Sequence, residues 1–137
     1  MTLLVQENMT LERLLPSMEL PLICAQLSVS NLQVDSRKIV AGDVFIALNA
    51  WSDSGHGGHE FIDAAIAAGA AAIIFDAPDN SFSNDGIPRI GIPRLAAEIS
   101  AIAGRLYQHP SAQLPLIAIT GTNGKTTCGQ LLAQIFS

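Results

Sequence analysis

Positive charge is scarce in this chain. Only 14% of its 137 residues are charged, and the formal net charge at pH 7 is −5. Lysine occurs only at Lys38 and Lys125. A nucleic-acid backbone is bound by basic side chains that displace its counterions, and this sequence supplies no broad basic face for that. We therefore expect no nucleic-acid partner.

Long apolar runs and export signals are lacking too. The longest uncharged apolar run, Ala64 to Phe75, is shorter than the roughly 20 residues that a bilayer span needs. The first 24 residues contain glutamates and prolines, whereas a signal peptide needs a basic start and an unbroken apolar stretch. The two cysteines, Cys24 and Cys128, have no metal-type spacing and should stay reduced. We expect a cytoplasmic monomer without membrane insertion.

What the chain does contain is a series of short apolar segments separated by Gly, Pro, Asn and Asp clusters. Their patterns predict strands at 32–34, 44–48, 71–75 and 87–92, and helices at 10–15, 61–68 and 94–107. Residues 76–86 read as a polar loop, and Pro88 should confine its strand to an edge or an end. Leu95, Ile99, Ile102 and Leu106 recur at spacings of four, three and four, on one helical face. This alternation is typical of an α/β domain.

A second α/β domain is expected to begin near residues 111–115. Leu116 to Thr120 reads as a buried strand that leads directly into Gly121, and Lys125 to Phe136 reads as a helix. A buried parallel strand needs neighbouring strands and covering helices, which the remaining residues do not supply. We therefore predict a first domain at 1–112, and at 113–137 the opening strand, loop and helix of an incomplete second domain.

The loop at 121–127, Gly-Thr-Asn-Gly-Lys-Thr-Thr, has the composition of a phosphate-binding loop. Glycines let the backbone turn tightly and bring N–H groups to phosphate oxygens, and the dipole of the following helix favours negative charge. Lys125 would reach the β and γ phosphates, and Thr126 would coordinate Mg²⁺. The predicted ATP site comprises Gly121, Thr122, Asn123, Gly124, Lys125, Thr126 and Thr127.

The glycine spacing departs from the general form G-x-x-x-x-G-K-[ST], because Ile119 stands five positions before Gly124. This difference argues against a generic GTPase or kinase. A glycine-rich turn that merely caps a helix, with a solvated Lys125, is the alternative. Asn123 could either orient the loop or contact phosphate.

The segment from Thr120 to Thr127 resembles the ATP loop of the Mur ligases, which add amino acids to the UDP-N-acetylmuramoyl peptide of peptidoglycan. Segments resembling that family's N-terminal substrate domain precede it in the same order, at 34–37, 41–48, 58–62, 64–66 and 69–70. Within the family, the most similar members join a diamino acid to UDP-N-acetylmuramoyl-L-alanyl-D-glutamate. The segments that carry this closer resemblance are 100–107, 109–111 and 126–134.

The resemblance implies that Val34 and Ser36 hold the uracil end of a uridine nucleotide. From the residues alone, a local side-chain turn at Asp35 and Ser36 and a surface ion pair of Arg37 explain the segment equally simply. Further contacts would correspond loosely to Trp51, Ser52 and Asp53. His56 and His59, with Asp53 and Glu60, suit a loop and a helix start better than a metal site, because glycines flank the histidines.

The resemblance also implies the reaction. ATP phosphorylates the D-glutamate γ-carboxylate to an acyl phosphate, which the amine of the diamino acid attacks, while catalytic Lys125 and Mg²⁺ stabilise the phosphoryl charge. The small-molecule partners are a UDP-N-acetylmuramoyl dipeptide and a diamino acid, for which we expect meso-diaminopimelate rather than L-lysine. The family's other active-site residues would follow Ser137, so we expect these 137 residues alone to be inactive. Another P-loop NTPase and a non-catalytic nucleotide-binding module are the alternatives.

Overall fold

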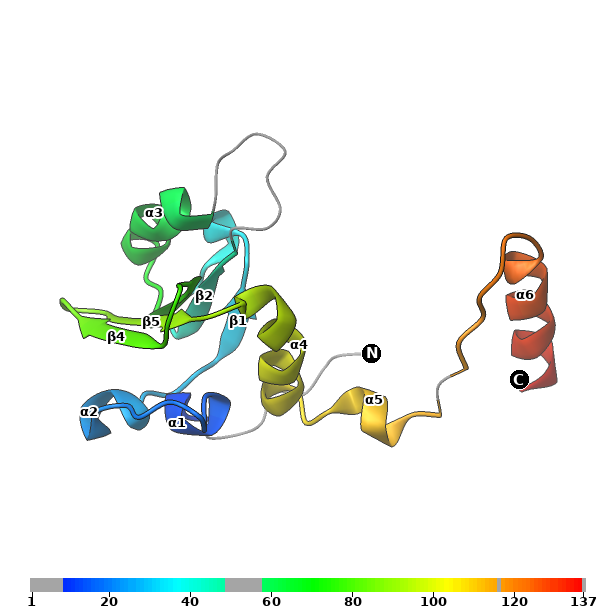
Figure 1. Ribbon diagram of the computed structural model, residues 1–137, viewed down its shortest axis with the longest axis horizontal. Coiled ribbons are helices and arrows are strands. Elements are labelled where there is room, and N and C mark those ends of the chain that lie inside the picture. Colours follow the sequence, from blue (N-terminus) through cyan, green and yellow to red (C-terminus); the bar gives the residue numbers. More distant parts are fainter. Residues whose placement is uncertain (1–8, 49–57, 116, 137) are drawn as a thin grey trace.

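The computed structural model describes residues 9–48, 58–115 and 117–136. At its centre is a five-stranded sheet with the order β1-β2-β3-β5-β4 (Figure 1). The strands are β1 (Asn31–Gln33), β2 (Asp43–Ala47), β3 (Ala72–Asp76), β4 (Ser81–Asn84) and β5 (Pro88–Ile92). All neighbouring pairs are parallel except β4 and β5. The expected α/β class is therefore confirmed.

Helices cover both faces of the sheet. The helices of the described chain are α1 (Leu11–Leu14), α2 (Leu22–Ala25), α3 (Ile62–Ala67), α4 (Leu95–Leu106), α5 (Pro110–Gln113) and α6 (Lys125–Ile135), with 3₁₀ turns η1 (Ser36–Lys38) and η2 (Gly58–Phe61). The core contains α1 and α4 on one face and α3 on the other. No helix of the described part of the chain has both the length and the apolar character of a bilayer span.

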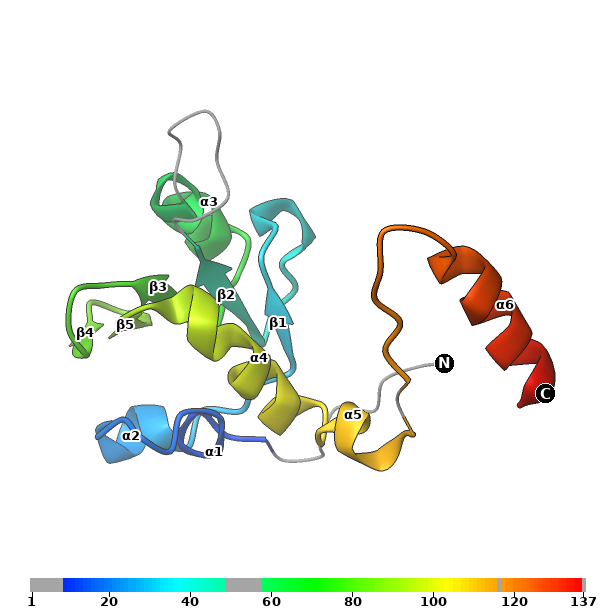
Figure 2. The ribbon, with the colours of Figure 1, turned by 45° about the vertical axis from the view of Figure 1, so that its right-hand side comes forward.

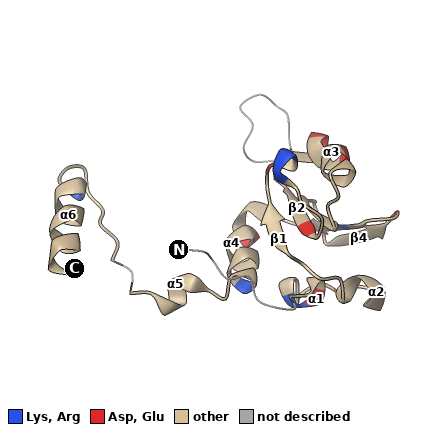
Figure 3. Ribbon diagram, turned by 180° about the vertical axis from the view of Figure 1, so that it is seen from behind, with Lys and Arg blue, Asp and Glu red and all other residues tan. Residues whose placement is uncertain are grey.

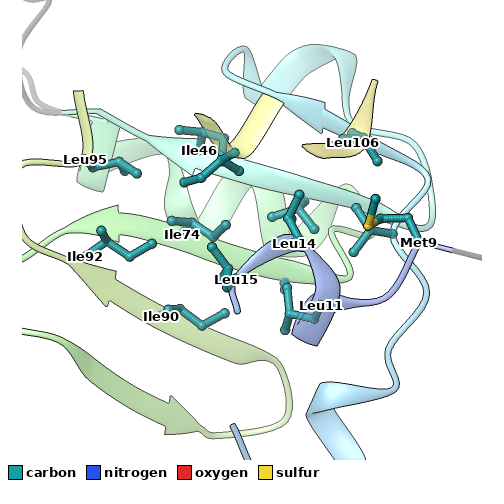
Figure 4. Close-up of a cluster of buried hydrophobic side chains, with 14 residues drawn as sticks. Met9, Leu11, Leu14, Leu15, Ile46, Ile74, Ile90, Ile92, Leu95 and Leu106 are labelled. Atoms are coloured by element: carbon teal, nitrogen blue, oxygen red, sulfur yellow. The ribbon is translucent and has the colours of Figure 1, made fainter. Parts of the chain in front are cut away.

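Strand alternation divides the core into these two layers. In β2, Val44 and Ile46 face the layer under α1 and α4, whereas Phe45 and Ala47 face the layer under α3, as the period of two in a strand requires. Figure 4 shows side chains of α1 meeting those of β2, β3 and β5 in the first layer. On α4, Leu95, Ile102 and Leu106 are buried and Ile99 is partly buried, which confirms the predicted helical face.

Three sequence-based expectations about secondary structure are wrong. Residues 76–86 contain β4 rather than only a loop; Phe82 is the one apolar residue of this strand, which is held by its antiparallel pairing with β5. Residues 110–113, for which the sequence patterns predicted no helix, form α5, with Pro110 at its first position, where a missing N–H costs nothing. Residues 117–120 form no strand, because no described strand pairs with them.

Other expectations hold with small shifts. Pro88 is the first residue of β5, so it lies at a strand end as expected, although β5 itself is an interior strand. Gly69, which follows α3, has a left-handed backbone with φ of +97°, as glycine commonly has just after a helix. In Figures 1 and 2, α6 lies apart from the sheet, joined to it through α5 and an extended segment.

Candidate functional site

The predicted phosphate loop is a tight turn that leads directly into α6. Gly121 and Gly124 have positive φ, +145° and +78°, in regions that residues with a Cβ rarely occupy. Gly124 is the residue before the helix, and Lys125 is its first residue, as the sequence predicted. The two glycines therefore let the chain reverse so that the helix start faces out of the loop.

The N-terminus of α6 has unsatisfied donors. Gly124 has no side chain to cap the helix, and the first backbone bond of the helix runs from the N–H of Cys128 to the carbonyl of Gly124 at 2.9 Å. The N–H groups of Lys125, Thr126 and Thr127 donate to no acceptor among the described residues. Such donors, together with the helix dipole, form an anion-binding site.

Lys125 is folded back over this loop. Its ammonium Nζ donates to the carbonyl of Gly121 at 2.6 Å and lies 3.5 Å from the carbonyl of Thr122. The residues of the loop, 120–128, are all exposed. The Lys125 ammonium, the only positively charged group of the loop, is therefore held against the turn at 121–122, near the N–H groups that have no acceptor. Figure 3 shows positive charge at the start of α6 and, separately, at η1.

The second predicted site lies where β1 ends. Val34 follows the strand and its side chain is 62% exposed, whereas Ser36 begins η1 and is buried. Asp35 caps this turn, because its Oδ1 accepts from the N–H of Arg37 at 3.1 Å. The structure thus holds Ser36 inside and leaves Val34 open at the carboxyl end of a strand, where α/β sheets bind ligands.

Asp35 and Arg37 form a bidentate ion pair. Arg37 donates from Nε to Oδ1 and from Nη2 to Oδ2, each at 2.9 Å. Hydrogen bonds from the Arg37 side chain, and then from its backbone N–H, lower the pKa of Asp35 to about 2. The side-chain turn and the surface ion pair that the residues alone suggested are both present, so Arg37 is engaged with the turn itself.

The described residues contain no group of three or more metal-binding side chains, but Asp53 and His56 lie outside them, so the absence of a metal site at these residues stays a prediction. His59 instead stacks edge-on against Phe75, with ring centroids 5.4 Å apart and an interplanar angle of 74°. Trp51, Ser52, Asp53 and His56 lie outside the described residues.

Gly58 has a role that the sequence reading did not assign. Its N–H donates to the carbonyl of Leu48 at 2.9 Å, and a Cβ at this position would lie 2.7 Å from the backbone of Ala47 and Leu48. Only glycine fits this approach, which brings η2 against the end of β2. In the sequence, only the glycine pair Gly57-Gly58 before the predicted helix at 61–68 indicated such a close backbone approach.

The structure does not bring the two predicted sites together. Val34 and Ser36 lie at the sheet, whereas residues 121–127 lie with α6, and both views of the chain show these regions apart (Figures 1 and 2). Each site must therefore be assessed on its own geometry.

Comparisons with known proteins agree with this architecture. The profile of the Mur ligase family, described as its catalytic domain, matches residues 28–106. A UDP-N-acetylmuramoyl-L-alanyl-D-glutamate–2,6-diaminopimelate ligase from Haemophilus ducreyi is 45% identical over 121 residues, which cover 77% of this chain and 23% of the relative. The chain thus spans about a quarter of the length of that relative.

Solved structures give the same result. A UDP-N-acetylmuramoyl-L-alanyl-D-glutamate–2,6-diaminopimelate ligase superposes with a TM-score of 0.70 and 28% identity, over 93% of this chain and 25% of that one. A MurF ligase from Thermotoga maritima in complex with ADP has a TM-score of 0.50 and 25% identity, over 72% of this chain and 21% of that one.

Proposed function

The chain belongs to the Mur ligase family, and we propose that it is the amino-terminal part of an ATP-dependent ligase of peptidoglycan precursor synthesis. This ligase would add a diamino acid, meso-diaminopimelate, to UDP-N-acetylmuramoyl-L-alanyl-D-glutamate. The observation that carries the proposal is the exposed turn at 121–124 before α6, with open N–H donors and Lys125 folded over it. The similarity to named diaminopimelate ligases supports the choice of substrate.

The residues present fit ATP with Mg²⁺. The free N–H groups of Lys125, Thr126 and Thr127 suit phosphate oxygens, and the Thr126 hydroxyl on the first turn of α6 suits a bridging Mg²⁺. The ADP in the Thermotoga maritima MurF ligase supports a nucleotide for this family. When bound, ATP would supply the γ-phosphoryl group that converts the D-glutamate γ-carboxylate into an acyl phosphate open to attack by an amine.

Lys125 is the residue that we assign to catalysis. Its Nζ donates to the carbonyl of Gly121, so it would exchange this partner for phosphate oxygens when a nucleotide binds. A cation held at that place stabilises charge that develops during phosphoryl transfer. The glycines, with Thr122 and Asn123, would shape the turn around the phosphates.

Val34 and Ser36 are proposed to hold the uracil end of the UDP substrate. Support comes from their place at the carboxyl end of β1 and from the Asp35–Arg37 pair, which fixes the turn around buried Ser36. Exposed Val34 offers an apolar surface and backbone groups to a planar base. The uridine site would then belong to a substrate domain at 1–112, and the ATP site to the part that begins at 113.

These 137 residues supply only part of an active site, so we propose that the chain alone has no ligase activity. Lys125 is the one basic side chain at the loop, and the loop residues 120–128 are all exposed. An assay with the UDP-muramoyl dipeptide, ATP and meso-diaminopimelate should show no turnover. Amide formation by the isolated chain would contradict this proposal.

Nucleotide binding is tested with the two lysines of the chain. In ¹⁵N–¹H NMR spectra, Mg-ATP should shift the amide signals of residues 121–127, and Lys125→Ala should weaken binding about tenfold or more, because a charge-assisted hydrogen bond is lost. Lys38→Ala is the matched control and should leave binding unchanged. If Lys125→Ala binds as tightly as the unmodified chain, the turn is only a helix cap.

Substrate binding separates the ligase from another P-loop NTPase. The UDP-muramoyl dipeptide should shift the signals of Val34 and Ser36, whereas a free muramoyl peptide without the uridine should leave them in place. Absence of any response to the UDP substrate, with Mg-ATP still bound at 121–127, would favour the NTPase.

A further inference from the structure

A cavity on the α1 and α4 side of the sheet is used by neither proposed site. It has a volume of about 250 Å³ and lies between the connection after α1, the end of β5 and α4. This is below the roughly 300–1,000 Å³ of pockets that hold drug-sized ligands, so it suits a ligand smaller than a nucleotide. Its apolar and polar walls include Met18, Ile92, Ile102, Asn80, Glu98 and Arg105.

Arg105 offers a fixed cation to this cavity. Its Nη1 donates to the carbonyl of Leu14 at 3.1 Å, which ties the end of α4 to α1. The guanidinium carries further N–H donors, and no carboxylate of the described residues forms an ion pair with it. A guanidinium that is already held in place binds a carboxylate with little further loss of side-chain freedom.

Glu98 offers the opposite charge on the same helix. It precedes Arg105 by seven residues, so the two side chains leave α4 on one face, about 10 Å apart along the helix axis. This spacing exceeds the three or four residues that favour a direct pair. Glu98 is exposed and makes no hydrogen bond or ion pair with the described residues. The cavity wall thus carries a carboxylate and a guanidinium that form no ion pair with the described residues.

The remaining wall is apolar. Ile92 and Ile102 are buried and Met18 is partly buried, so an aliphatic group placed against them would leave water. We propose that this cavity binds a free aliphatic α-amino acid. The ligand carboxylate would meet Arg105, its ammonium would meet Glu98, and its side chain would rest on the apolar wall. This site is independent of the proposed ligase function.

The probe is L-leucine, titrated into the ¹⁵N-labelled 137-residue chain. Amide signals of Met18, Asn80, Ile102 and Arg105 should shift together along one binding curve, while those of residues 121–127 stay in place. If leucine leaves the cavity signals unmoved up to its solubility limit, the proposal is overturned.

Variants of the ligand test the two charges. Leucinamide lacks the carboxylate and N-acetyl-leucine lacks the ammonium. The affinity of each should therefore be lower than that of leucine by about tenfold or more. Equal binding of leucine and N-acetyl-leucine would reduce the cavity to an anion site and would overturn the assignment of an amino acid.

Glu98→Gln is the clean protein variant, since Arg105 also holds the carbonyl of Leu14 and its removal would disturb the fold. The exposed, unpaired carboxylate should be replaceable without a change in melting temperature, and leucine affinity should fall about tenfold. Asp63→Asn, on the opposite side of the sheet in α3, is the matched control and should leave affinity unchanged. Equal leucine affinity in Glu98→Gln would show that no ammonium lies at this residue.

Discussion

The sheet region (described residues 9–48 and 58–113) and the loop region with α6 (residues 117–136) differ in how much apolar burial stabilises them. Every buried hydrophobic residue of the described chain lies between Met9 and Leu106, and α6 buries none. The sheet region is stabilised by apolar burial from both faces. The loop region buries no side chain of α6, although it carries the clearest chemical motif. The motif at 121–127 is therefore recognisable in the sequence, although no buried residue of the described chain lies in α6.

The largest difference between the two regions should appear in the free energy of unfolding when a buried side chain is shortened in one region and an exposed one in the other. Ile74 is fully buried in β3, between β2 and β5, so Ile74→Ala should lower the free energy of unfolding by about 2–5 kcal/mol. Ile135→Ala, on α6, removes a side chain that is 72% exposed and should change it by less than about 0.5 kcal/mol. Urea denaturation followed by circular dichroism measures both. Similar losses would mean that α6 packs on the sheet region in solution.

The sequence predicted the sheet region well because burial leaves a periodic signal. Strands β2 and β3 and helix α4 were found within one residue, since their apolar residues alternate or recur at helical spacing. Strand β4 was missed because its pairing with β5, rather than its own sequence, stabilises it. Pairing partners lie elsewhere in the chain and cannot be read locally.

The site was predicted unevenly for a related reason. Gly124 and Lys125 predicted a turn and a helix start, which depend on local backbone geometry. The structure has the turn at Gly124 and begins α6 at Lys125. The strand expected before Gly121 is absent from the described residues 117–120, because an apolar run becomes a strand only beside a partner strand. The close approach of Gly58 to β2 also depends on a distant segment, and sequence reading missed it.

Adding one methyl group at Gly58 should disturb the close contact between η2 and the end of β2. In Gly58→Ala the new Cβ would lie 2.7 Å from the backbone of Ala47 and Leu48, and backbone atoms have little freedom to move. The free energy of unfolding of the sheet region should fall by about 1–3 kcal/mol. Melting curves followed by near-UV circular dichroism would register the loss. An unchanged melting temperature would mean that η2 lies further from β2 in solution.

The same substitution in α6 should act in the opposite direction. At Gly129 the nearest atom to a new Cβ is Ile119 Cδ1 at 3.7 Å, an ordinary contact. Alanine favours a helix interior over glycine by about 1 kcal/mol, so Gly129→Ala should raise the helical population of α6. Carbon secondary chemical shifts of residues 125–135 measure this, and the melting temperature of the sheet region should not move. A shift of that temperature would couple the two regions.

The smallest effect should come from acid at the turn after β1. Because Arg37 lowers the pKa of Asp35 to about 2 from 3.8, the ion pair favours the folded turn above pH 3.8, and this contribution is lost as the pH falls towards 2. The amide signal of Arg37, bonded to Asp35 Oδ1, should titrate in this window, while the signals of α6 stay constant. Asp35→Asn removes the titrating group and should abolish the transition. A midpoint near 3.8 in the unmodified chain would mean that the pair does not form in solution, and that Ser36 is held by burial alone.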